Sequence, residues 1–285
     1  MKRPSEIARE EASMTTLTEL TSAFEGIASM RIAQVKSQVQ QSTKFFNELW
    51  HIYLQLRAGT SFSFGRDKSD TDYIDKELYI IVTAEGGFSG DIDEKLVQLM
   101  LQDYDKDKHD IIVIGHHGAV QLAQRGIGYK RYFKLPAKDQ NINVAPIIRE
   151  VQHYRTTKLF YQEYVSLMVQ DVKRIELSAV VQERGATSQK PEEVISEDTY
   201  IFEPSTYSVA AHLERSMMQI AVSQLILESK LAQYASRFRA MSASHERADD
   251  SRAELQLDYN RAKRSVKDER LKESINGLKK ARVGV

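Results

Sequence analysis

The sequence contains no cysteine, which excludes several kinds of site at once. Without thiols the chain can form neither disulfides nor thiolate metal sites, and it has no cysteine nucleophile. It also lacks any apolar run close to the roughly 20 residues that span a bilayer. Its first residues have no apolar signal-peptide core. We therefore expect the chain to fold in the compartment where it is made and to reach a membrane only through a partner.

An excess of charge of one sign is missing as well. Lys plus Arg and Asp plus Glu number 40 each, so the formal net charge is zero. A nucleic-acid-binding protein needs a positive excess to neutralise phosphates, so the composition argues against that class. The 285 residues are 41% hydrophobic and 28% charged, as in an ordinary soluble protein, and suffice for one large domain or two small ones.

Proline and glycine are scarce at both ends of the chain. No proline follows Pro204, and no glycine occurs at 205–276. Residues 5–57 contain no proline and a single glycine, Gly26. Stretches without helix breakers predict two long helices. The second would begin at Ser205 as N-cap. At about 1.5 Å per residue it would be on the order of 100 Å long, too long to be enclosed by its own domain.

The predicted C-terminal helix carries a heptad seam. Alternating steps of four and three residues from Leu213 to Val266 meet mostly apolar side chains, with three polar interruptions, which is typical of a coiled coil. The positions between them are Met217, Ile220, Gln224, Leu227, Leu231, Tyr234, Phe238, Met241, His245, Ala248, Arg252, Leu255, Tyr259 and Ala262.

The predicted N-terminal helix has a weaker apolar stripe, which needs a partner to bury it. We expect the two helices to pack as an antiparallel coiled coil, with Leu231, Phe238 and Met241 facing the N-terminal helix. The stripe consists of Leu17, Leu20, Phe24 and Ile27 at its start and of Phe45, Leu49, Ile52 and Leu56 at its end, broadened by Phe46 and Trp50.

The middle of the chain alternates short strand-like and helical patterns. Apolar β-rich runs at 77–84 and 110–115 flank a helical pattern at 91–104, which predicts a parallel βαβ unit. Further strands are predicted at 129–135 and 174–181, with a helix at 144–170 between them, a linker at 59–69 and a polar loop at 185–198. We expect a small Rossmann-like α/β domain with a mostly parallel sheet, inserted at 61–204 between the coiled-coil helices of 1–60 and 205–285.

A glycine-rich turn, GGFSG at 86–90, follows the first predicted strand. Such a turn before a helix can hold a phosphate. It matches neither dinucleotide-binding nor P-loop spacing, however, and Glu85 and Asp91 on either side would repel a phosphate. A structural turn is the preferred interpretation, and nucleotide binding is the alternative.

No constellation of catalytic or metal-binding residues is recognisable elsewhere. His116 and His117 are adjacent, so they point in different directions, and no second cluster stands at ligand spacing. Asp249 and Asp250 fall on the long helix, where carboxylates are usually solvated. We therefore predict no catalytic, cofactor-binding or metal-binding residue. The basic residues near the end of the long helix, including Lys263, have two interpretations: charges favoured by the helix dipole, or a positive surface for an acidic partner.

Several segments resemble the gamma subunit of rotary F-type ATP synthases. YIFEP at 200–204, ESKLAQYASRFRAMSAS at 228–244 and LQLDYNRAKR at 255–264 are similar to that family's C-terminal helix. LTSAFEGIASMRIAQ at 20–34 resembles its N-terminal helix, and IVTAEGGFSGDID at 81–93 resembles a loop of its middle domain. The chain departs from the family near its end, where VKDERLK at 266–272 is far more charged.

The resemblance implies a central rotor shaft that couples ion flow to ATP synthesis or hydrolysis and has no active site of its own. Its partners would be the alpha and beta nucleotide-binding subunits, an epsilon-type subunit and a membrane c-ring, with one copy per complex. The complex would hold it at the cytoplasmic face of a bacterial plasma membrane, not secreted. A coiled-coil scaffold with a ligand-binding α/β domain is the alternative, and a small nucleotide-dependent enzyme is a third. Candidate partner contacts are Phe24, Arg31, Arg237, Lys263, Arg264 and Lys267.

Overall fold

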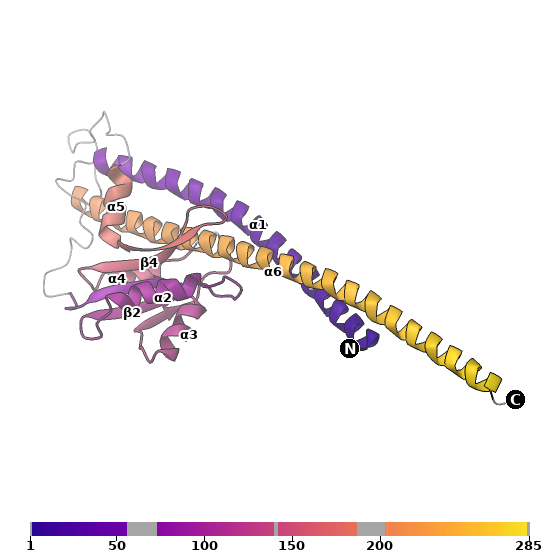
Figure 1. The fold of residues 1–285 in the computed structure, drawn as a ribbon. Coiled ribbons are helices and arrows are strands. Elements are labelled where there is room, and N and C mark those ends of the chain that lie inside the picture. Colours follow the sequence, from indigo (N-terminus) through magenta and orange to yellow (C-terminus); the bar gives the residue numbers. More distant parts are fainter. Residues whose placement is uncertain (1, 56–72, 140–141, 187–202, 204, 284–285) are drawn as a thin grey trace. The chain divides into compact units, whose positions relative to one another are not determined.

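The computed structural model describes residues 2–55, 73–139, 142–186, 203 and 205–283. The predicted linker at 59–69 and most of the predicted loop at 185–198 lie outside these ranges. The described chain forms two compact units, one of Met1–Ile27 with Phe238–Val285 and one of Ala28–Arg237. Helices α1 (Pro4–Gln55) and α6 (Thr206–Val283) each contribute residues to both units (Figure 1). No helix in the described ranges is long and apolar enough to cross a membrane.

Both predicted long helices are present, with 52 residues in α1 and 78 in α6. The hydroxyl oxygen of Ser205 accepts a hydrogen bond of 3.2 Å from the backbone N–H of Ser208, as expected of an N-cap. Helix α6 continues through Gly277, because a single exposed glycine costs a helix only about 1 kcal/mol.

The heptad seam predicted in α6 is confirmed. Every seam position from Leu213 to Val266 is buried or half-buried, including the polar residues Gln224, His245 and Arg252. Leu257, which lies outside the seam, has 59% of its surface exposed. Burial therefore follows position in the repeat rather than the hydrophobicity of the single residue.

The apolar stripe predicted in α1 is confirmed only near its end, where Phe46 and Trp50 are buried and Leu49 is half-buried. Leu20 is 52% exposed, and Leu17, Phe24, Ile27, Phe45 and Ile52 are exposed too. The face that is buried or half-buried is also spaced by fours and threes and shares Phe46 and Leu49 with the predicted stripe. It consists of Ile7, Glu11, Met14, Thr18, Thr21, Glu25, Ala28, Ile32, Val35, Val39, Ser42, Phe46, Leu49 and Tyr53.

Polar residues in the seam of α6 explain this choice of face. Nδ1 of His245 lies 3.1 Å from the carbonyl oxygen of Thr18 and 3.4 Å from the hydroxyl of Thr21. A leucine stripe would leave this half-buried imidazole without polar partners, which costs free energy. The threonine face is therefore the one that satisfies the seam of α6.

The two helices run antiparallel in the unit Ala28–Arg237. Val35 packs with Leu227 and Leu231, and further along α1 the hydroxyl of Tyr53 donates a 2.7 Å hydrogen bond to Glu214, nearer the start of α6. Leu231 faces α1 as predicted. In the other unit, Met241 is buried and Phe238 is half-buried.

A five-stranded sheet forms the centre of the unit Ala28–Arg237, in the order β3-β2-β1-β4-β5. Strands β1 to β4 are parallel, and β5 pairs antiparallel with β4. The chain moves outward from β1 to β3 and then returns to place β4 on the other side of β1. The topological switch point therefore lies between β1 and β4. The strands are Glu77–Val82, His109–Ile114, Arg131–Phe133, Thr157–Tyr164 and Gln170–Glu176.

Two sequence predictions in this region are wrong. The helix predicted at 144–170 is a short helix, α4 (Ala145–Val151), followed by β4, because the central strand is fixed by pairing with β1 rather than by local pattern. The strand predicted at 174–181 ends at Glu176 and continues as helix α5 (Leu177–Ala186), which buries Leu177, Val180 and Val181 at helical spacing.

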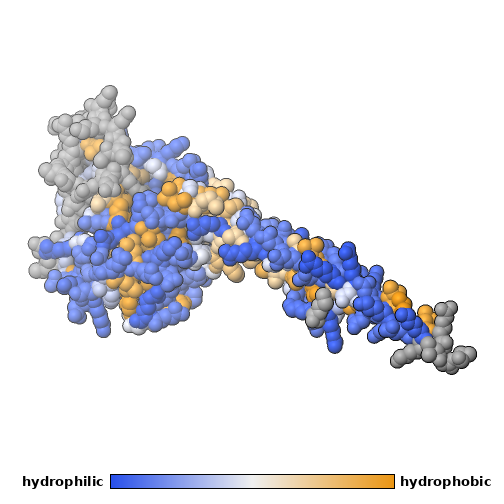
Figure 2. Space-filling model, in the orientation of Figure 1, coloured by the Kyte–Doolittle hydropathy of each residue, from blue (hydrophilic) through white to orange (hydrophobic). Residues whose placement is uncertain are grey.

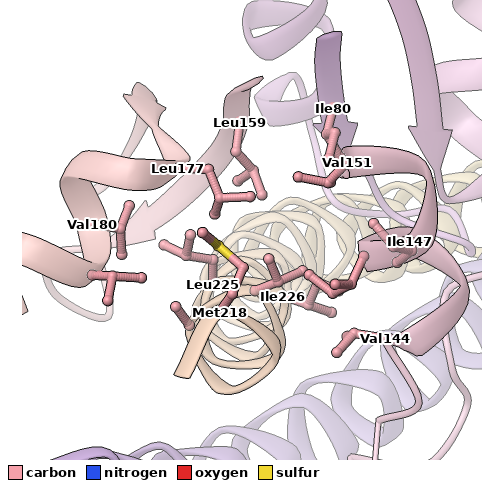
Figure 3. Close-up of a cluster of buried hydrophobic side chains, with 14 of the residues drawn as sticks. Ile80, Val144, Ile147, Val151, Leu159, Leu177, Val180, Met218, Leu225 and Ile226 are labelled. Carbon is pink, nitrogen blue, oxygen red and sulfur yellow. The ribbon is translucent and has the colours of Figure 1, made fainter. Parts of the chain in front are cut away.

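Helices cover both faces of the sheet. Tyr79 and Ile81 of β1 pack under α2 (Ile92–Gln102) and α3 (His116–Gln124), whereas Leu78, Ile80 and Val82 face the opposite core. That second core takes in side chains of α1, α4, α5 and α6. Figure 3 shows Met218, Leu225 and Ile226 of α6 surrounded by residues of the sheet, α4 and α5.

Candidate functional site

The carboxyl ends of β1 and β4 flank the switch point, where open α/β sheets usually bind their ligands. Gln162, fully buried near the end of β4, donates a 2.8 Å hydrogen bond from Nε2 to the Oδ1 of Asp93 in α2. Its Oε1 accepts hydrogen bonds from the hydroxyl of Ser229 and, at 3.2 Å, from Nε2 of Gln233. Side chains of α6 therefore occupy the switch-point crevice.

Asp93 is the centre of this polar cluster. Its buried carboxylate also accepts a hydrogen bond of 3.1 Å from the backbone N–H of Ala84 and one of 3.4 Å from the hydroxyl of Ser89. Nδ1 of His117 lies 2.9 Å from its Oδ2, and this hydrogen bond raises the pKa of His117. A buried carboxylate needs such partners to offset its lost hydration.

The glycine-rich turn at 86–90 is held by α6 rather than open to a ligand. The hydroxyl of Ser236 donates to the carbonyl oxygen of Ser89 at 2.7 Å. Arg237 donates from Nε to the carbonyl of Gly87 at 3.0 Å and from Nη2 to that of Gly86 at 3.2 Å. A phosphate-binding turn instead presents backbone N–H groups to its ligand. The contacts favour the structural interpretation of this turn.

Arg237, one of the predicted partner contacts, is thus engaged inside the unit Ala28–Arg237. Its guanidinium carbon also lies 5.6 Å from the ring centroid of Tyr234. Burial lowers the pKa of Arg237 and raises that of Tyr234. In the fold, Arg237 fixes the turn after β1 through its hydrogen bonds to the carbonyls of Gly86 and Gly87.

A buried ion pair joins α6 to the segment after β3. Lys230 of α6 is 3% exposed, pairs with the fully buried carboxylate of Asp139, and donates a 2.7 Å hydrogen bond to the carbonyl of Pro136. The other oxygen of Asp139 lies 3.4 Å from Nη1 of Arg31 in α1. The predicted contact residue Arg31 is therefore also linked within the chain, although its side chain is 41% exposed.

A groove of about 820 Å³ lies beside this ion pair, lined by α1, α6, Asp139 and residues 142–145. Glutamine, asparagine and serine side chains line much of it, and Asp139 is the one acidic residue among the described residues that line it. Arg31 and Lys230 already engage that carboxylate, which does not favour a role as general acid or base.

The adjacent residues His116 and His117 make separate contacts within the fold. His117 bonds Asp93, and the backbone N–H of His116 donates 3.2 Å to Glu85. No group of three or more His, Asp or Glu side chains that could hold a metal occurs in the part of the chain described. Asp249, on α6, lies 3.0 Å from Arg252 and is solvent-exposed.

The remaining predicted contacts lie in the unit Met1–Ile27 with Phe238–Val285. Ala262 is the last buried residue of α6 among the described side chains, and Lys263, Arg264 and Lys267 beyond it are exposed. Nζ of Lys263 lies 5.5 Å from the ring centroid of Tyr259. The charges of Arg264 and Lys267 face solvent.

The first four residues of the apolar stripe predicted in α1, among them the predicted partner contact Phe24, form an exposed surface that we call the outer stripe of α1. We use this name for Leu17, Leu20, Phe24 and Ile27, which lie outside the buried seam and are each at least 37% exposed. Figure 2 shows further hydrophobic patches along the otherwise hydrophilic C-terminal part of α6, where Leu257, Leu271, Ile275 and Leu278 are exposed. Apolar surface of this kind on a helix is typical of an interaction site.

Comparisons with known proteins agree on one family. A family model described as ATP synthase matches residues 4–279. The ATP synthase gamma chain of Mycoplasmoides gallisepticum is 20% identical over 286 residues, covering 96% of this chain and 98% of the relative. A chain of the Euglena gracilis mitochondrial ATP synthase (OSCP/F1/c-ring, rotational state 3) has a similar fold, with a TM-score of 0.66 and 14% identity over 98% of this chain and 96% of that one. A chain of the Tetrahymena thermophila mitochondrial ATP synthase central stalk/c-ring has a TM-score of 0.54 and is 17% identical, covering 79% of this chain and 98% of that one.

Proposed function

The chain belongs to the ATP synthase gamma chain family, and on this premise we propose how it acts as a rotor. It is the gamma subunit of the central stalk of an F-type ATP synthase, a non-catalytic part of that complex. In the proposed mechanism, ion flow through a membrane ring turns the chain, and each orientation changes nucleotide affinity at catalytic sites on other subunits. The coupling is a free energy shared between distant sites rather than local chemistry.

The match over residues 4–279 carries this proposal. The packing of the helices supports it, since a shaft must be stiff. Val35, Leu227 and Leu231 form a buried cluster between α1 and α6, and Tyr53 bonds Glu214 across the same pair. A continuous seam with interdigitated side chains resists bending and sliding better than a lone helix.

The outer stripe of α1 and the basic residues of α6 would provide the contacts to the nucleotide-binding ring. Phe24 and its apolar neighbours offer a surface for apolar groups of the alpha and beta subunits. Lys263, Arg264 and Lys267 would meet acidic groups of the same ring. Two chemically different surfaces make the shaft asymmetric, which is required if one orientation is to favour one catalytic site.

The α/β sheet is proposed to lie against the membrane c-ring and the epsilon-type subunit. One copy per complex would serve, because a central axle must break the symmetry of the ring around it. The complex would hold the chain at the cytoplasmic face of a bacterial plasma membrane.

The alternative of a scaffold with a ligand-binding α/β domain receives less support. Ligands of such domains bind at the carboxyl edge of the sheet. Here Ser229, Gln233, Ser236 and Arg237 of α6 already bond the groups at that edge. A ligand at this edge would have to displace the side chains of helix α6.

Co-purification with ATPase subunits tests the rotor function. We expect the tagged chain to isolate alpha and beta subunits, and native mass spectrometry should give one copy per three beta subunits, as a central axle requires. Membranes depleted of the chain should lose ATP-driven ion pumping and regain it on readdition. A chain that purifies alone from cells with an intact ATP synthase would contradict the proposal.

A further inference from the structure

We propose that the ion pair of Asp139 and Lys230 is a positioning pair that transmits torque between helix α6 and the α/β sheet. The inference rests on the rotor function proposed above. A rotor driven at its sheet and working through its helices needs a joint that does not slip. The chain supplies one where α6 passes the carboxyl edge of the sheet.

Helix α6 changes character along its length. From Ala210 to Ile226 its buried apolar side chains belong to the apolar core that includes Ile80 and Leu159. Apolar contact is non-directional, so it holds the helix against the sheet without fixing its rotation or register strongly. From Ser229 onward α6 adds polar contacts to the sheet and to the segments that follow its strands.

We call the five polar residues of this segment the α6 joint. They bond three different segments of the sheet: β4 through Gln162, the turn after β1 through Ser89 and its glycines, and the segment after β3 through Pro136 and Asp139. Hydrogen bonds weaken steeply with misalignment, so a helix held from three directions cannot rotate without losing several at once. The members are Ser229, Lys230, Gln233, Ser236 and Arg237.

Among the contacts of the α6 joint, the pair of Lys230 with Asp139 resists displacement most strongly. Both are almost completely buried, at 0% and 3% exposure. A displacement that separates them leaves two charges unpaired away from water, which is strongly unfavourable. Asp139 also meets Arg31, so one carboxylate ties together α6, α1 and the sheet.

Stability alone does not account for this pair. Replacing a buried ion pair by well-packed apolar side chains is often neutral or stabilising. A fold that needed only cohesion here could extend the apolar core by one more turn of α6. Buried charges instead select one register of the helix, which is the property a torque-bearing joint requires.

The test uses the assembled ATP synthase carrying Asp139→Leu with Lys230→Met. We expect ATP turnover to continue while pumping per ATP falls about three- to tenfold, because residues of a coupling network change the coupling between sites by factors of this order. Lys230→Arg should pump normally because the charge remains. The matched control, Glu77→Leu with Lys158→Met, removes a 2.7 Å ion pair at the opposite, amino edge of the sheet and should also pump normally.

A direct measurement of torque separates slipping from other defects. Because the chain has no cysteine, Gln124→Cys on the exposed end of α3 gives a unique attachment point for a bead. The Leu–Met double variant should rotate the bead normally at low viscous load and stall at loads that the parent tolerates. Normal rotation and pumping in this variant, with an unchanged melting temperature, would overturn the proposal.

A second variant keeps the test decisive if the first fails to fold. Asp139→Asn with Lys230→Gln removes both charges and keeps a polar side chain at each position. The same loss of pumping per ATP is expected, and normal coupling would again overturn the proposal. Failure of the rotor function itself has a different signature, since the unmodified chain would not assemble with ATPase subunits.

Discussion

Nδ1 of His117 lies 2.9 Å from Oδ2 of the buried Asp93, so that helix α3 contributes directly to the polar cluster at the carboxyl edge of the sheet. The same carboxylate bonds Gln162, which in turn bonds Ser229 of α6. The titratable ring of His117 is thus connected to helix α6 through a chain of three hydrogen bonds.

This contact predicts a pH dependence of stability. The hydrogen bond to Asp93 raises the pKa of His117, aided by Glu85 and opposed by burial and by Arg237. A raised pKa in the folded state adds stability below the unfolded value of about 6.5, and this is lost as pH rises through the folded-state pKa. In urea titrations of the isolated chain, His117→Gln should flatten the fall in unfolding free energy over that interval.

His109 provides the control, because its pKa shift has the opposite sign. Burial lowers the pKa of His109 in the folded state. The unfolding free energy therefore falls as pH drops from the unfolded value of about 6.5 towards the folded-state pKa. His109→Gln should therefore flatten the acidic side of the profile and leave the other side unchanged. Identical profiles for both variants would show that neither ring titrates as its contacts indicate.

Gly115 gives a second prediction, on stability. Its φ is 98°, and a Cβ at this position would lie 2.0 Å from the carbonyl oxygen of Thr83 at the end of β1. Gly115→Ala should lower the unfolding free energy by at least about 3 kcal/mol, because backbone strain and a clash with main-chain atoms add. Gly128→Ala, which meets open space, should change it by less than about 0.5 kcal/mol. Equal urea midpoints for the two variants would contradict this.

The seam of α6 could be predicted from sequence because a repeat sustained from Leu213 to Val266 is a local signal. The buried face of α1 could not, because the partner decides it. His245 requires the polar groups of Thr18 and Thr21, and leucines at neighbouring positions outweigh them in any count of hydrophobic residues. Pattern reasoning therefore located the helix and identified Phe46 and Trp50 as buried near its end, but it chose the wrong side in the first half of the helix.

The residues of the α6 joint and their partners could not be predicted from the sequence either. Lys230 and Asp139 stand far apart in the chain, and each is an ordinary surface residue by type. Only the return of β4 beside β1 brings the carboxyl edge of the sheet against α6. The same pairing explains why the helix predicted at 144–170 is wrong. The three-part division at 60 and 204 stays a prediction.

The glycine-rich turn leads to a prediction about nucleotides. Isolated chain titrated with ATP in a calorimeter should give no saturable heat at micromolar concentrations. The carbonyl groups of Gly86 and Gly87 are bonded by Arg237, and the carboxylates of Glu85 and Asp91 flank the turn. Arg237→Ala should not create binding, since it removes the nearest cation. A micromolar affinity in the unmodified chain would favour the ligand-binding or enzyme alternatives.

The last prediction concerns the exposed charges of α6 in the assembled enzyme. Arg264→Ala with Lys267→Ala should reduce ATP-driven ion pumping more than assembly, because these side chains face solvent beyond the last buried seam residue, Ala262. Solvated charges contribute little to the helix pair itself, so the melting temperature of the isolated chain should not change. The matched control is Arg261→Ala, an exposed cation of the same helix that is already paired with Asp258. Normal pumping and ATP turnover in a fully assembled Arg264/Lys267 variant would place the torque contact elsewhere on the shaft, with the outer stripe of α1 as the next surface to test.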